Sequence, residues 1–193
     1  MKAIWRAAAI LRDPFAEWAK IETEPDDPGA LMFRYVALFA LVPALAGFVG
    51  ACIIGTIAPA GAVVRAPLFD GIFGAIFGYL EAFATTLLLG LVIALAAPLF
   101  GGRTNFAGAL KLAVYSYTPA WLTGIFLLLP GLRFLMLGGF YGAYLLLAGL
   151  PRVTKSPPSK SPAFAALIVA FACALTLLAA ALQRMLFASS VGL

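Results

Sequence analysis

Long apolar runs, separated by short polar connections, make up most of the chain. An α-helix rises about 1.5 Å per residue, so about 20 apolar residues cross a hydrocarbon core of roughly 30 Å. We therefore predict an all-α, polytopic membrane protein with one transmembrane domain over residues 31–190. Its five membrane-crossing helices, packed as a bundle, are expected over residues 33–58, 72–100, 106–129, 132–150 and 163–187.

The first 30 residues form a sizeable segment outside these runs. Asp13 followed by Pro14 is typical of a helix start, with Asp as the N-cap and Pro at the first helical position. Phe15, Trp18 and Ile21 recur at every third position and so share one face. This amphipathic pattern favours either a helix on the membrane surface or a cap packed under the bundle. The side chains expected to anchor it in the membrane interface are Trp5, Phe15 and Trp18.

Residues 110–150 predict a transmembrane hairpin around which the other helices are arranged. Its two apolar runs are joined by the short turn Pro130-Gly131-Leu132-Arg133, which forces them antiparallel. In the second run, Gly138 and Gly142 form a small-xxx-small pair that lets another backbone approach closely. Two tyrosines of that run are expected to pack against the first run, namely Tyr141 and Tyr144.

The first run of the hairpin carries a polar patch, Tyr115-Ser116-Tyr117-Thr118-Pro119, where a lipid-facing helix would carry leucine. Pro119 has no amide hydrogen, so it should bend the helix and leave the carbonyl of Tyr115 unpaired. We expect the hydroxyls of Ser116 and Thr118 to compensate for that loss. The patch is a candidate lining for a polar pocket, or else a helix-packing feature.

Glu81 is the acid placed deep inside an apolar run. It follows Gly74 and Gly78 and precedes Thr85 at spacings of three and four, so all four share one helical face. A carboxylate in the membrane is costly and is expected to face the bundle interior, either in a proton or cation site or in a structural ion pair or hydrogen bond. The basic residues expected at the same side of the membrane are Arg133 and Arg184.

The composition indicates that lipid is the solvent. The chain is 64% apolar and 11% charged, with a mean hydropathy of +1.05, whereas a soluble domain has about 25% charged residues. Histidine is absent, which removes the commonest general base and transition-metal ligand. Cys52 and Cys173 lie inside apolar runs and are expected to pack as small hydrophobes. With no motif for a nucleophile, a phosphate loop or a metal, we expect no catalytic residue, metal site or cofactor.

The basic residues divide unequally between the two sides of the predicted bundle. Ten of the 13 Lys and Arg residues fall on the side of the N-terminus. The three on the other side are Arg65, Arg133 and Arg184. Because cytoplasmic connections carry the excess of Lys and Arg, we expect a cytoplasmic N-terminus and a C-terminus outside. This distribution over short connections indicates membrane orientation and not nucleic-acid binding.

Three short motifs occur in order along the chain. They are Pro14-Phe15-Ala16-Glu17-Trp18-Ala19-Lys20-Ile21-Glu22 before the first span, Tyr115-Ser116-Tyr117-Thr118-Pro119 in the third, and Tyr141-Gly142-Ala143-Tyr144 with Gly149-Leu150 in the fourth. In this order they resemble the Yip family, the Ypt/Rab-interacting membrane proteins, and most closely its bacterial members. The resemblance covers nearly the whole chain. It implies five spans with a cytosolic N-terminus and, for a bacterial member, a place in the inner membrane.

The resemblance implies little chemistry. Eukaryotic members bind Rab GTPases and partner Yip proteins, but this chain lacks their long polar N-terminal region and their Asp-Leu-Tyr-Gly-Pro motif, which makes binding of a small GTPase doubtful. We expect a non-enzymatic scaffold or adaptor that acts through contacts with the lipid bilayer and with other helices. Oligomers are expected through the Gly74/Gly78 or the Gly138/Gly142 face. The alternative is a small transporter, channel or lipid-binding protein with a cavity lined by Glu81 and the patch from Tyr115 to Pro119.

Overall fold

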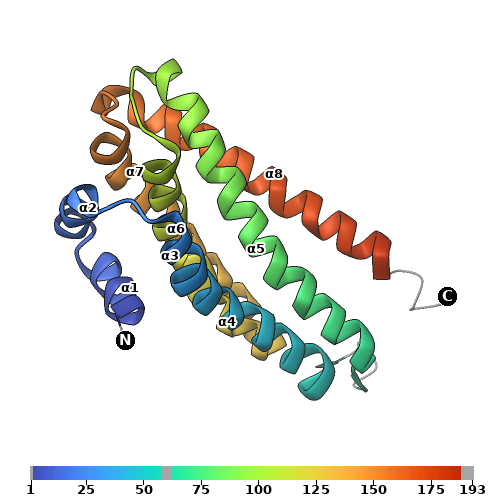
Figure 1. The fold of residues 1–193 in the computed structure, drawn as a ribbon. Helices are drawn as coiled ribbons and strands as arrows, with labels where there is room; N and C mark the ends of the chain where they lie inside the picture. Colours follow the sequence, from blue (N-terminus) through green and yellow to red (C-terminus); the bar gives the residue numbers. More distant parts are fainter. Residues whose placement is uncertain (1, 58–61, 188–193) are drawn as a thin grey trace.

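The computed structural model describes residues 2–57 and 62–187, which form a bundle of long helices with two short helices on its flank (Figure 1). The two flanking helices are α1 (Lys2–Arg12) and α2 (Pro14–Thr23). The first long helix is continuous over Pro28–Ile54 and consists of α3 (Pro28–Ala30), the π-helical η1 (Leu31–Val36), α4 (Ala37–Phe48) and the π-helical η2 (Val49–Ile54). It is followed by a minimal antiparallel pair, β1 (Thr56–Ile57) and β2 (Val63–Val64).

The remaining helices complete the bundle. They are α5 (Leu68–Ala96) with the 3₁₀ turn η3 (Ala97–Phe100), α6 (Phe106–Thr123) with η4 (Gly124–Leu128), η5 (Pro130–Phe140) with α7 (Tyr141–Thr154), and η6 (Pro158–Lys160) with α8 (Ser161–Phe187). The fold is therefore all-helical apart from the two-residue strands. Asp13 caps α2 as predicted, because its side chain accepts a hydrogen bond from the amide of Ala16 at 3.0 Å.

Helix α6 is the centre of the bundle. Eleven of its 18 residues are buried, and α4, α5, η5 and α7 all pack against it. Gly74 and Gly78 of α5 do not lie against α6, since a Cβ at Gly74 would meet only Gln183 of α8 and one at Gly78 would meet nothing within 4 Å. Instead Gly90 of α5 lies against α6, where a Cβ would stand 3.1 Å from the Cα of Leu110.

Four helices of the described residues are long and apolar enough to cross a membrane. They are Pro28–Ile54, Leu68–Phe100, Pro130–Thr154 and Pro158–Met185. The count of five is not confirmed, because the helix formed by α6 and η4 does not reach the same hydropathy. Its sequence contains Lys111 and the patch from Tyr115 to Pro119, which a central helix tolerates because protein, not lipid, surrounds it.

Two helix boundaries differ from the predicted ones for local reasons. Helix α5 begins at Leu68, four residues early, directly after Pro67, whose extended backbone allows a helix to start. Helix α7 continues through Pro151 to Thr154, whereas we predicted a loop from Pro151. It ends at Lys155, which adopts the left-handed conformation with φ of 54° typical of a helix C-cap.

The connections before α3, before α6 and after α7 meet at one end of the bundle, which we call the basic end. Lys155, after α7, forms an ion pair with Glu22 of α2. Asn105, before α6, donates a hydrogen bond to Asp26 at 3.1 Å. The amide of Arg103 donates to the carbonyl oxygen of Thr154 at 2.6 Å. These contacts bring the N-terminal helices and two later connections to the same end.

Candidate functional site

The N-terminal helices are held on the bundle by Trp18. Its side chain is fully buried, and its indole nitrogen donates a hydrogen bond to the carbonyl oxygen of Leu145 at 3.0 Å. The indole lies against Gly149 of α7, where a Cβ would stand 2.6 Å from the ring. Trp18 therefore does not anchor the chain in the membrane interface, contrary to the prediction. The sequence left open whether α2 lies on the membrane surface or packs against the bundle. In the structure α2 packs against α7, and we call α1 and α2 together the cap.

Trp5 and Phe15 differ from Trp18 in exposure. The Trp5 side chain is 69% exposed and the Phe15 side chain 54%. Both rings are therefore accessible to lipid, and their role as interface anchors remains a prediction. Phe15 also contacts the ring of Tyr144 edge-on, with the centroids 6.4 Å apart.

An aromatic chain leads from the cap into the bundle. The ring of Tyr115 on α6 packs edge-on against Trp18 of α2 and Tyr35 of η1, with centroid distances of 6.2 Å and 5.0 Å. The hydroxyl of Tyr35 is hydrogen-bonded to the hydroxyl of Thr118 at 2.9 Å, with both groups buried. Tyr115 and Thr118 are three residues apart on α6 and so reach the same neighbour.

Ion pairs join the N-terminal helices to each other and to the connection after α2. Arg6 of α1 pairs with Glu17 of α2 and with Glu24 after it, and Glu17 also accepts from Lys20 at 3.1 Å. Burial alone would lower the pKa of Arg6. The hydrogen bond to Glu24 and the charges of both acids outweigh that effect, so the pKa is raised and the guanidinium stays charged.

Lys111 is the cation buried in α6. Its ammonium donates to the carbonyl oxygen of Glu24 at 2.6 Å and pairs with the carboxylate of Asp26 at 2.6 Å. Hydrogen bonds from Lys111 and Asn105 hold the pKa of Asp26 below its ordinary value, and they outweigh the opposing effect of burial. Beside this pair lies a polar cavity of about 250 Å³ between α1, η1 and α6. Its basic lining residues are Lys2, Arg6, Arg34 and Lys111.

Comparison with known proteins decides the family. The Yip1 domain model matches residues 8–181, which is most of the chain. The chain belongs to the Yip1 domain family. It is 28% identical, over 155 residues and 78% of each chain, to the inner membrane protein YohC of Escherichia coli strain K12, and to the same extent to YohC of Escherichia coli O6:H1. No solved structure matches the chain.

The hydroxyl-rich patch of this Yip1 domain does not form a single site. Tyr115 and Thr118 face the cap and η1, whereas Ser116 and Tyr117 line a second, apolar pocket on another side of α6. The predicted repair of the Pro119 gap is also wrong. The Ser116 hydroxyl has no hydrogen-bond partner among the described residues, and the Thr118 hydroxyl bonds to Tyr35.

Tyr141 and Tyr144 pack differently from the prediction. The hydroxyl of Tyr141 donates to the carbonyl oxygen of Leu11 at 3.2 Å, and Tyr144 contacts Phe15. Their rings contact each other, with centroids 5.3 Å apart. These contacts lie between α7 and the N-terminal helices, because α2 docks on α7.

Glu81 is hydrogen-bonded within its own helix. Its carboxylate accepts a hydrogen bond from the hydroxyl of Thr85 at 2.8 Å, one turn further along α5. None of the ion pairs found among the described residues joins it to Arg133 or Arg184. Glu81 lines neither the polar cavity at Lys111 nor the apolar pocket at Ser116, so these two pockets do not support the predicted cavity shared by Glu81 and the Tyr115–Pro119 patch.

The two glycine pairs have different environments. A Cβ at Gly142 would stand 2.4 Å from the carbonyl oxygen of Ser116, and one at Gly138 would stand 3.1 Å from Thr123, so this face packs on α6 within the chain. It is therefore not available for the oligomer contact that we predicted. A Cβ at Gly74 would stand 3.2 Å from the side chain of Gln183 of α8, and one at Gly78 would meet no atom of another helix within 4 Å.

Two features of the contact between the cap and the bundle were not predicted from the sequence. Lys111 enters the sequence prediction only as one of the ten basic residues on the side of the N-terminus, although a lone lysine in an apolar run is itself a signal for a buried partner. Gly149 was noted only as part of a motif, and no signal in one sequence shows that an indole lies against it.

Within the described residues, no group of three His, Cys, Asp or Glu side chains is placed to hold a metal ion.

Proposed function

We propose that this Yip1-domain protein is an integral membrane scaffold or adaptor that acts through helix–helix and membrane contacts, without a catalytic step. The proposal rests on the contacts that polar residues make between the cap and the bundle. Tyr115 and Thr118 pack against Trp18 and Tyr35, and Lys111 is held by Asp26 and a carbonyl oxygen. Each of these side chains holds two elements of the chain together, and this structural role is the one that a scaffold requires of its polar residues.

The surroundings of Gly78 on α5 support this role. A Cβ at Gly78 would meet no atom of another helix within 4 Å, and a helix with small residues at such a position lets a second helix approach closely. The Gly74 position on the same face meets only the end of the Gln183 side chain. We propose that this face contacts a membrane helix of a second copy or of another protein.

We further propose that α6 crosses the membrane, which gives five spans, and that the basic end faces the cytoplasm. Ten of the 13 basic residues belong to the side of the N-terminus, and the positive-inside rule places that side in the cytoplasm. Reporter tags on the two termini should then lie on opposite sides of the membrane. Tags on the same side would contradict five spans.

The scaffold proposal is tested by cross-linking in native membranes. A photoreactive residue at Ala75, one helical turn before Gly78, should give a discrete protein adduct that mass spectrometry assigns to a second copy or a partner. Gly78→Leu should abolish that adduct by blocking close approach. The same photoreactive residue at Leu80, on the opposite face, is the matched control. Lipid adducts alone at both positions would contradict the scaffold proposal.

A further inference from the structure

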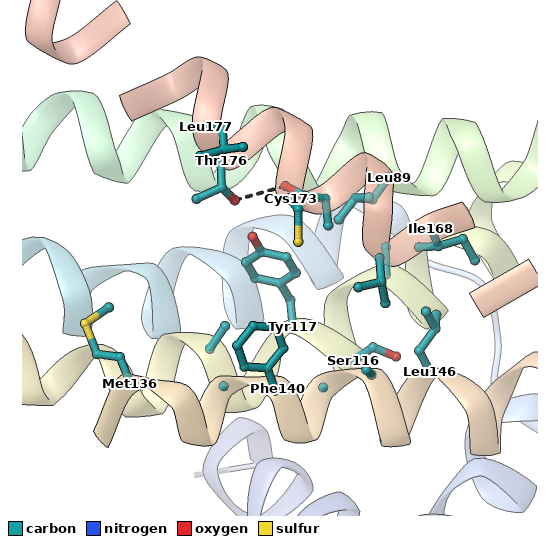
Figure 2. Close-up of a pocket in the computed structure, with 17 residues that line it drawn as sticks. Leu89, Ser116, Tyr117, Met136, Phe140, Leu146, Ile168, Cys173, Thr176 and Leu177 are labelled. Carbon is teal, nitrogen blue, oxygen red and sulfur yellow. Dashed lines mark hydrogen bonds between the residues drawn. The ribbon is translucent and has the colours of Figure 1, made fainter. Parts of the chain in front are cut away.

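An apolar pocket of about 540 Å³ lies on the side of α6 away from the cap. Its walls come from α5, α6, the η5–α7 hairpin arm and α8 (Figure 2). The volume lies within the range of roughly 300–1,000 Å³ typical of small-molecule sites. None of the described residues that line it is charged. An ionised group would lose its hydration there without gaining a partner, so an occupant of this pocket must be neutral.

Ser116 is the polar group that the packing leaves unsatisfied. Its residue is 8% exposed, and its hydroxyl has no hydrogen-bond partner among the described residues. Figure 2 shows the hydroxyl oxygen directed along the pocket toward Leu146. A buried hydroxyl without a partner is unfavourable, and serine in a helix commonly bonds to the carbonyl four residues earlier. That bond, to Leu112, is not among those found.

A second polar group lies at the same pocket. Tyr117 follows Ser116 on α6, and its hydroxyl points toward Cys173 and Thr176 of α8 (Figure 2). The hydroxyl of Thr176 already donates to the carbonyl oxygen of Ala172 at 3.0 Å. The pocket thus combines long apolar walls with two hydroxyl groups on α6, of which the Ser116 hydroxyl is free to donate.

The depth of Ser116 in the membrane limits which classes of molecule can place an oxygen beside it. Ser116 is ten residues from the start of α6, so it lies about 15 Å along the helix, near the middle of a hydrocarbon core of about 30 Å. This step rests on the proposed crossing of α6. The phosphate and ester groups of a phospholipid lie in the interface outside the hydrocarbon core, because the charged phosphate loses its hydration at greater depth. A neutral lipid can place an oxygen there.

We infer that the pocket binds one neutral membrane lipid, an apolar chain bearing a hydroxyl or carbonyl oxygen that pairs with Ser116. The chain fills the apolar walls between α6, α7 and α8, and the oxygen bonds to the Ser116 hydroxyl. Fatty alcohols, diacylglycerols and isoprenoid alcohols or quinones all have this chemistry. The inference adds a ligand site and does not require the scaffold role.

The test compares two photoreactive, alkyne-tagged probes, a hexadecanol and the matching hexadecane, on the full chain in lipid vesicles. The hexadecanol probe should label peptides from residues 113–120 and 168–177. Ser116→Ala should weaken that labelling by about two- to tenfold, the effect of losing one hydrogen bond, and leave the hexadecane signal unchanged. Competition by unlabelled prenol, diacylglycerol or quinone then identifies the natural source.

Two variants on α8 separate the pocket from lipid on the outer surface. Ala172→Phe fills the pocket and should abolish labelling by both probes, whereas Leu178→Phe, at a 55% exposed position outside the lining, should not. Equal labelling of Ala172→Phe and wild type would overturn the site. Equal loss of both probes in Ser116→Ala would overturn the assigned hydrogen bond. The terminal tags report separately on the crossing of α6.

Discussion

The indole of Trp18 hydrogen-bonds to the carbonyl oxygen of Leu145 at 3.0 Å and joins two helices separated by 127 positions in the chain. This contact fixes α2 on α7 from within the protein. It makes the N-terminal segment part of the bundle, where an interface helix would have placed its indole among lipid headgroups.

Removing the Trp18 side chain should release the cap. We expect Trp18→Ala to lower the free energy of unfolding by about 3 kcal/mol or more, because a fully buried indole and its hydrogen bond are lost together. Trp18→Phe should cost roughly 1–2 kcal/mol. Thermal unfolding in detergent measures both changes, and protease cleavage between residues 23 and 28 reports on release. Trp5→Phe, at a 69% exposed position, should leave stability unchanged.

Gly149 is the position where any side chain would meet Trp18. A Cβ there stands 2.6 Å from both the indole and a methyl carbon of Leu112, so we expect Gly149→Ala to destabilise the fold by about 1–3 kcal/mol through overpacking. The matched control is Gly78→Ala, also in a long helix, where the added Cβ would meet no atom of another helix within 4 Å. Equal unfolding midpoints for the two variants would show that the indole does not lie against Gly149.

The hydrogen bond between Tyr35 and Thr118 should be measurable by a double-mutant cycle. Thr118→Val and Tyr35→Phe each remove one hydroxyl with little change of volume. Their coupling energy should be about 0.5–1.5 kcal/mol, the net contribution typical of one hydrogen bond within a protein. Chemical or thermal unfolding of the four proteins gives this value. Additive effects would contradict the contact.

Stability should depend on pH through Asp26. Its pKa in the folded protein lies below the ordinary value of 3.8, so its contribution is fully present above that value and is lost as pH falls through the lower folded pKa. We expect unfolding midpoints in detergent to drop below about pH 4. Asp26→Asn should flatten this dependence, and Asn105→Ala should weaken it only in part. An unchanged pH profile in Asp26→Asn would exclude the Lys111 pair as its source.

Glu81→Gln should be tolerated. The glutamine keeps a side-chain oxygen that accepts from Thr85, so we expect the free energy of unfolding to change by less than about 1 kcal/mol. Thermal unfolding in detergent tests this. A marked loss of stability would instead indicate that the negative charge has a basic partner. Glu81→Leu, which removes the acceptor altogether, distinguishes a hydrogen-bonding role from a packing role.

The sequence by itself determined the fold class, the family and most helix positions. Apolar runs of this length fit only a lipid environment, and Asp13 with Pro14 marked the start of α2 through local capping chemistry. These features are set by residues near each other in the chain. For that reason a single sequence contains the information needed to predict them.

Only the tertiary structure decided where the side chains go. Tyr115, Ser116 and Tyr117 are consecutive, yet each turns by about 100° around the helix, so the neighbouring helix decides what each one meets. The amphipathic pattern around Trp18 predicts which helix face it occupies, but not what covers it. Gly149 and the carbonyl oxygen of Leu145, both distant in sequence, form the site in which its indole is buried. Close packing between helices depends on pairs of residues that no local pattern connects, and this is why the cap and the pocket appear only in three dimensions.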